Sequence, residues 1–395
     1  MTEEQKPEML YFGELRFNDE AKINVARAMD KRYIAAADTE VAQYQEEWGK
    51  LFGYKHNVAM YSGTGADTVA CKTLYDVHPR TKRSLHLEDN EIIAPANAFI
   101  AVGSSIVDAG FMPVFVDIER ETLNINPGKI EEKVTDKTRA IMAVHTMGKP
   151  CEMDTIIDIA RRHELLVIED SCEAHAAKFK DKYIGHWGDM ATFSSYVAHL
   201  ICSTEGGMLS TNNETIGEIA ASLRNHGRKV GSMYFDYVWL GGNYKMHDLE
   251  AAVGRAAIGK FWETFHIRKN NIYWMMNATK DLQEYAHMNV EGKHEIICPH
   301  AYTVTIRDPK QFSYRALYDY MYDNPILHIA AKRNFGSIPT QHKAFEFLGR
   351  TLGEFPEAEY VGDNGLHFGL HQYTTQDQLE RASEVLHTFF SKFKK

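Results

Sequence analysis

The sequence predicts an α/β protein in which helices cover both faces of a mostly parallel sheet and a smaller domain follows. Apolar runs of strand length alternate with segments of helical periodicity through the first half of the chain. Such runs are typical of parallel strands that are buried on both faces. The chain has 395 residues, enough for a large core and a second domain.

The elements of the expected sheet domain follow in order. Residues 21–52 have the apolar spacing of helices. A strand at 57–61 comes next, then a Ser-Gly-Thr-Gly turn and a further helix. The other expected elements are strands at 91–94, 112–116, 140–145, 165–169, 190–194 and 207–211, and helices at 98–107 and 154–163. No helix of ordinary length fits between the last two strands.

The pattern changes in the last third of the chain. Residues 248–285 have the periodicity of long helices, and residues 379–390 form an amphipathic terminal helix. Shorter strands and helices are expected between them. We therefore predict a large domain over residues 1–262 and a small α+β domain over residues 263–395.

Composition narrows the function classes. The formal charge is −10, from 44 basic and 54 acidic residues, and no long basic run occurs, which argues against nucleic acid as a partner. The start of the chain has no apolar targeting segment, and no apolar run has membrane-spanning length. The five cysteines are scattered without a paired motif, as in reduced proteins. We expect a cytoplasmic protein without a membrane partner.

Several polar residues fall where open α/β sheets place their ligands. Asp170 ends an apolar strand, where its carboxylate could cap a helix or hold a proton on a pyridine nitrogen. Ser194 ends another strand, and its hydroxyl suits a phosphate oxygen. The turn at residues 62–65 joins a strand to a helix, whose amino end attracts phosphate. The histidines have no clear metal-ligand spacing, so no metal is predicted.

Taken in order, these and other motifs resemble one enzyme family. The chain is similar to the sugar aminotransferase/dehydratase family (DegT/DnrJ/EryC1-like) of fold-type I enzymes that depend on pyridoxal 5'-phosphate. The resemblance covers nearly the whole chain. It is carried by the segments Ser62–Thr64, Pro95–Ala101, Pro113–Asp117, His145–Asp154, Glu169–Ala174 and Asn243–Leu249. It implies a mostly parallel, seven-stranded-type sheet in the large domain.

The resemblance also implies a role for individual residues around the ring of pyridoxal phosphate or pyridoxamine phosphate. Asp170 would pair with the ring nitrogen, Phe99 would stack on the ring, and Glu173 would lie near the ring hydroxyl. For Phe99, packing in the core is the alternative.

The phosphate contacts follow in the same way. Ser194 and the turn of Gly63, Thr64 and Gly65 would hold the cofactor's phosphate. Asn243 would reach the phosphate of the neighbouring subunit, so a homodimer with shared active sites is expected. For Asn243, the alternative is a helix cap.

The chain departs from the aminotransferases of this family at position 199. Five residues after the phosphate-binding Ser they have the Lys that binds the cofactor covalently, and here that residue is His199. An imidazole cannot form that bond but can move protons. This resembles one branch, the 3-dehydratases of nucleotide-linked 4-keto-6-deoxy sugars. The resemblance implies pyridoxamine phosphate as cofactor, GDP-4-keto-6-deoxymannose as the favoured substrate, and glutamate as amino donor.

Other interpretations stay open. The chain could be an aminotransferase-like enzyme for another substrate, or a non-catalytic relative that binds the cofactor. The type of dehydratase that carries an iron–sulfur centre is disfavoured, because Arg224–Gly242 contains no Cys. Thr204 stands where relatives usually have Gly, and Ser195 where they usually have an aromatic residue. Both departures lie close to the cofactor motifs. The residues that recognise glutamate are unassigned, with Arg333 as one candidate.

Overall fold

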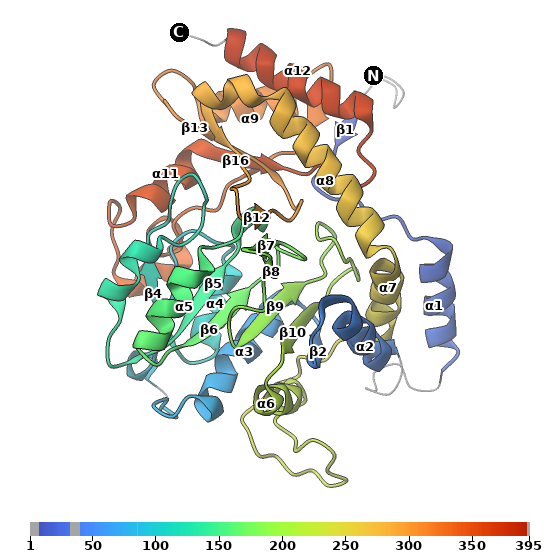
Figure 1. Cartoon of the computed structure of the whole chain (residues 1–395), viewed down its shortest axis with the longest axis vertical. Helices are drawn as coiled ribbons and strands as arrows, with labels where there is room; N and C mark the ends of the chain where they lie inside the picture. Colours follow the sequence, from blue (N-terminus) through green and yellow to red (C-terminus); the bar gives the residue numbers. More distant parts are fainter. Residues whose placement is uncertain (1–7, 32–39, 85, 393–395) are drawn as a thin grey trace.

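A computed structural model describes residues 8–31, 40–84 and 86–392. Its centre is a seven-stranded sheet (Figure 1). Across the sheet the strands are β2 (His56–Met60), β10 (Gly207–Thr211), β9 (Met190–Ser194), β6 (Leu166–Asp170), β5 (Thr138–Val144), β3 (Glu91–Pro95) and β4 (Met112–Val116). The strand β10 is antiparallel to both of its neighbours, and the other pairs are parallel. The prediction of an α/β fold with a mostly parallel sheet is confirmed.

Both faces of this sheet are covered by helices. One core contains α3 (Gly63–Val77), α4 (Ala101–Asp108) and α6 (Glu214–Arg224); the other contains α2 (Glu40–Phe52), α5 (Met153–Arg162) and α7 (Asp248–Gly259). The strand β5 shows why its sequence is continuously apolar. Ala140 and Met142 face the first core, while Ile141 and Ala143 face the second. The helix α1 (Asp19–Met29) packs beside α7.

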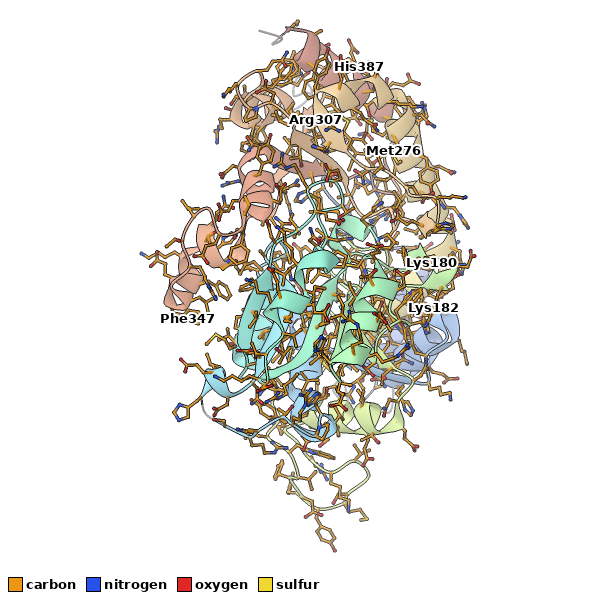
Figure 2. All side chains as sticks on the ribbon, turned by 60° about the vertical axis from the view of Figure 1, so that its left-hand side comes forward. Lys180, Lys182, Met276, Arg307, Phe347 and His387 are labelled. Carbon is orange, nitrogen blue, oxygen red and sulfur yellow. The ribbon has the colours of Figure 1, made fainter. Side chains whose placement is uncertain are left out.

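The last third of the chain forms a second region, in the upper part of Figure 1. The helix α8 (Phe261–Ala278) runs into it from α7. Its antiparallel sheet has the order β11 (Ala286–Met288), β13 (Tyr302–Ile306), β16 (Gly365–Phe368) and β15 (Lys332–Arg333). The helices α9 (Tyr314–Tyr322) and α12 (Gln376–Lys392) complete its core. The helices α10 (Ile338–Gln341) and α11 (Pro356–Asn364) bury residues in the first core, beside the large sheet. In Figure 2, the labelled Met276, Arg307 and His387 lie in this region.

The two regions are connected by more than α8. The strand β1 (Met9–Leu10) pairs with β14 (His328–Ile329), and Leu10 is buried in the core of the second region. A small sheet joins β12 (Glu295–Ile296) to the hairpin of β7 (Lys178–Phe179) and β8 (Lys182–Tyr183). The division between residues 262 and 263 stays a prediction; it falls within α8.

Most expected elements are observed within a few residues of their bounds. Residues 21–52 contain the helices α1 and α2, as expected, with residues 32–39 outside the described part. One element differs in kind. Gly63–Gly65 form the first turn of α3 instead of a preceding loop, because Ser62 caps the helix. In the described ranges, no helix is long and apolar enough to cross a membrane.

Candidate functional site

A cavity of about 380 Å³ opens where the carboxyl ends of the parallel strands meet the second region. Val144, Asp170 and Ser194 are the last residues of β5, β6 and β9, and all three line it. The amino end of α3 closes one side, and side chains from β15 and β16 close the opposite side. This is the edge of an open α/β sheet at which ligands bind.

The amino end of α3 forms one pole of the cavity. Ser62 accepts a hydrogen bond from Gly65 N–H at 3.0 Å, so the N–H groups of Gly63 and Thr64 carry the exposed end of the helix dipole. The helix approaches β9 closely, because a Cβ atom on Gly63 would lie 2.9 Å from Ser194 Cβ. A hydroxyl and a helix amino end therefore meet at one point, an arrangement suited to a phosphate.

Two buried carboxylates form a second pole of the cavity, and Cys172 lies between it and Gly63. Asp170 Oδ1 accepts a hydrogen bond from Cys172 N–H at 3.0 Å. Asp67 Oδ1, from the second turn of α3, accepts one from Thr192 Oγ1 at 2.6 Å. Burial raises the pKa of both carboxyls, and the nearby Asp170 charge raises that of Asp67 further. This pole is suited to a protonated ring nitrogen.

Glu173 lies between the loop after β6 and the second region. Its Oε2 accepts a hydrogen bond from Met147 N–H at 2.6 Å, and its Oε1 lies 3.4 Å from His300 Nε2. Burial opposes ionisation, but His300 and the backbone donor outweigh it and lower the pKa of Glu173. The residue is therefore an anion that faces the cavity.

His199 lies in the loop that follows β9. Its Nδ1 is 3.3 Å from the Tyr196 carbonyl oxygen; with Nδ1 donating there, Nε2 is the basic nitrogen. Burial, and next the neighbouring His300 and His175, lower the pKa of His199 well below 6.5. The ring is therefore neutral near pH 7 and able to accept a proton.

The buried guanidinium of Arg268 holds the backbone of this loop. It donates to the carbonyl oxygens of Ala198 and His199, at 2.8 and 3.3 Å. Arg268 lies on α8, so the helix that leads into the second region also fixes the position of the histidine.

The chain also matches known proteins along most of its length. Residues 17–387 match the DegT/DnrJ/EryC1/StrS aminotransferase family. The chain belongs to this family. GDP-perosamine synthase from Escherichia coli O157:H7 is 37% identical over 270 residues, 67% of this chain and 71% of that protein. GDP-4-keto-6-deoxy-D-mannose 3-dehydratase from Escherichia coli O55:H7 is 28% identical over 364 residues, 88% of this chain and 91% of that protein.

A solved structure agrees. Escherichia coli GDP-4-keto-6-deoxy-D-mannose-3-dehydratase with bound hydrated pyridoxal phosphate has a TM-score of 0.86 at 26% identity, and the match covers 96% of this chain and all of that one. The expected family and fold type I are confirmed. The expected cofactor is confirmed as that of the family.

The cavity of this family member fits the cofactor. It is lined by both a phosphate pole and a carboxylate pole, and Phe99 lines it beside Phe335, with ring centroids 5.8 Å apart. Most of the residues predicted for the site line this one cavity: Gly63, Thr64, Phe99, Asp170, Glu173, Ser194 and His199. Two do not. Gly65 uses its N–H in the helix cap, and Asn243 is exposed elsewhere on the chain.

Sequence reasoning missed several lining residues: Phe12, Asp67, His145, His300, Lys332, Phe335 and His367. Asp67 could have been predicted, because it is a carboxylate among apolar residues in the first turns of α3. His300 and His367 were not singled out, because no sequence signal brings the second region over the sheet edge. Arg333, the candidate for recognising glutamate, does line the cavity, beside Lys332.

Proposed function

We propose that the protein is a pyridoxamine-phosphate-dependent dehydratase that removes the C3 hydroxyl of a nucleotide-linked 4-keto-6-deoxy sugar. GDP-4-keto-6-deoxymannose is the favoured substrate, and glutamate restores the amino form of the cofactor. The observation that carries the proposal is His199, a neutral imidazole lining the cavity at the position where aminotransferases of this family have Lys.

Different residues of the cavity bind different parts of the cofactor. Gly63, Thr64 and Ser194 hold its phosphate, and Asp170 pairs with its ring nitrogen. Phe99 stacks on the ring, and Glu173 lies near the ring hydroxyl. Gly65 supports the phosphate site by its bond to Ser62.

When bound, pyridoxamine phosphate supplies an amine for the C4 ketone and a ring that accepts electrons while the C3 hydroxyl leaves. His199 would carry protons at Nε2: it would accept one there as a base and then give a proton to the hydroxide that departs from C3, so that water leaves. The hydrogen bond from Nδ1 to the Tyr196 carbonyl oxygen and the hydrogen bond from Arg268 to the loop backbone hold the ring in place, with Nε2 facing the cavity. Lys332 and Arg333 supply positive charge for the carboxylates of glutamate or the diphosphate of the nucleotide.

The test is the product of an incubation with GDP-4-keto-6-deoxymannose, pyridoxal phosphate and glutamate, read by mass spectrometry and NMR. We expect a sugar without its C3 hydroxyl, together with ammonia and 2-oxoglutarate. The His199→Asn variant should form it at least about 10²-fold more slowly. The matched control is His387→Asn, on α12 at the top of Figure 2 and not among the residues that line the cavity, which should behave as wild type. A 4-amino sugar as product would contradict the proposal.

Transfer of an amino group is the second candidate function. Over the part that each relative matches, the GDP-perosamine synthase is more identical to this chain than the 3-dehydratase is. Transfer of an amino group would need an amine in the cavity, and Lys332 has one, 4.5 Å from the centre of the Phe12 ring. Borohydride treatment with pyridoxal phosphate, followed by peptide mapping, distinguishes the two. The dehydratase proposal expects no cofactor attached to Lys332.

A further inference from the structure

The second carboxylate of the cavity, Asp67, has no part in the cofactor contacts above. It lies on α3, whereas Asp170 ends β6, so the two carboxylates meet only because α3 packs against β6 and β9. Oxygen atoms of both, together with Cys172 Sγ, lie within 4.8 Å of one another. Asp67 is 2% exposed and Asp170 is 7% exposed.

The hydrogen bonds to this pair come from neutral donors. Thr192 Oγ1 donates to Asp67, and Cys172 N–H donates to Asp170. Thr192 and Asp170 are neighbours across the parallel pair of β9 and β6, so the pair has a fixed geometry. Two buried carboxylates this close do not both ionise without a cation, and the favourable state is one shared proton.

We propose that Asp67 is a positioning residue that shares one proton with Asp170 in the cofactor-free protein and gives it up when the protonated ring nitrogen of the cofactor binds. This rests on the proposed function only in taking pyridoxamine phosphate as the ligand. The ring N–H takes the place of the shared proton between the two carboxylates. Two negative charges then hold the ring nitrogen protonated more strongly than Asp170 alone could. The released proton goes to water, and charge balances.

The experiment is calorimetric titration of the cofactor-free protein with pyridoxamine phosphate in buffers of different ionisation enthalpy, which counts the protons released. Several pH values between about 6 and 9 locate the titration of the pair. Wild type should release up to about one proton more than Asp67→Asn. The matched control is Asp189→Asn, a half-buried carboxyl that does not line the cavity, and its release should equal that of wild type.

A second readout separates this role from a structural one. With pyridoxamine phosphate labelled at the ring ¹⁵N, the protonated nitrogen signal should persist to a higher pH in wild type than in Asp67→Asn, by about one unit or more. Thr192→Val removes the hydroxyl donor but keeps both carboxylates, so it should retain the wild-type behaviour. If Asp67 only anchors Thr192, the two variants will behave alike, and the inference is wrong.

The outcomes separate the two proposals. Equal proton release and equal ¹⁵N titration in wild type and Asp67→Asn would overturn the role of Asp67 and leave the cofactor proposal intact. Failure of wild type to bind pyridoxamine phosphate at all would overturn both. If Asp67→Asn does not fold, Asp67→Glu, which keeps the carboxylate, should still release the proton.

Discussion

The imidazole rings of His199 and His300 both line the cavity, with centroids 5.0 Å apart and planes tilted by 47°. His199 belongs to the loop after β9, and His300 to the segment that enters β13. His300 is in turn 3.4 Å from Glu173. The second region thus places a basic group beside the proposed acid–base residue, so packing of the two regions controls the proton affinity of His199.

Replacing His300 should raise the pKa of His199. Burial is the largest cause of its low pKa, and His300 is the next. In His300→Gln the burial remains, so the pKa should move only part of the way back towards 6.5. The check is the acid limb of the pH–rate profile for dehydration, which should shift to higher pH than in wild type. His387→Gln is the matched control, and an unshifted limb in His300→Gln would contradict the coupling.

The wild-type profile itself tests the neutral state of His199. A base loses activity when the pH falls below its pKa, and the pKa of His199 lies well below 6.5. The single-turnover rate should therefore stay flat as the pH falls to 6.5, where an unperturbed His would already be half protonated. A loss of the single-turnover rate centred at pH 6.5 would show that burial does not lower the pKa of His199.

His199→Asn should separate chemistry from binding. Loss of the proton carrier should lower the single-turnover rate by at least about 10²-fold. The affinity for pyridoxamine phosphate should hardly change, because the phosphate and carboxylate poles remain. Equilibrium dialysis measures that affinity. A large loss of affinity would mean that His199 mainly holds the cofactor.

Local sequence predicted the parts of this site that lie at the ends of sheet strands. Asp170 and Ser194 follow apolar runs, and the position of a strand's last residue follows directly from where the run ends. The continuously apolar sequence of β5 likewise predicted that both faces of this strand are buried. The family resemblance added Phe99 and Glu173, which no periodicity distinguishes from core residues.

Long-range packing was not predictable in the same way. Lys332 and His367 reach the cavity from β15 and β16, which are short strands of another sheet. Their pairing is set by the fold of the last third of the chain, so local periodicity does not place either residue at the edge of the large sheet. Leu10, at the other end of the chain, joins the same region through β1, which no local pattern indicated.

Asn243 should act in the partner's site of a homodimer, and subunit mixing tests this. The residue is exposed and does not line the cavity of its own chain. Suppose that Asn243→Ala and His199→Asn each inactivate the protein. A mixed dimer then has one site with both changes and one with neither, so mixing should restore activity. Separate homodimers of either variant are the controls, and no recovery after verified exchange would contradict a shared site.

Thr204 should be a point of backbone strain beside the cavity. Its φ is +74°, a conformation in which a β-branched residue is strained. Relief of about 1–2 kcal/mol of strain exceeds the roughly 0.5–1 kcal/mol that Gly adds in unfolded-chain entropy. Thr204→Gly should therefore raise the free energy of unfolding by up to about 1 kcal/mol in urea titrations.

The neighbouring position provides the control for that substitution. Glu205 is also exposed, but it is not among the residues with positive φ. Glu205→Gly therefore relieves no strain and should lower the free energy of unfolding by about 0.5–1 kcal/mol. Opposite signs at two adjacent residues isolate the backbone conformation as the cause. If Thr204→Gly destabilises the protein as well, contacts of the threonine side chain outweigh the strain.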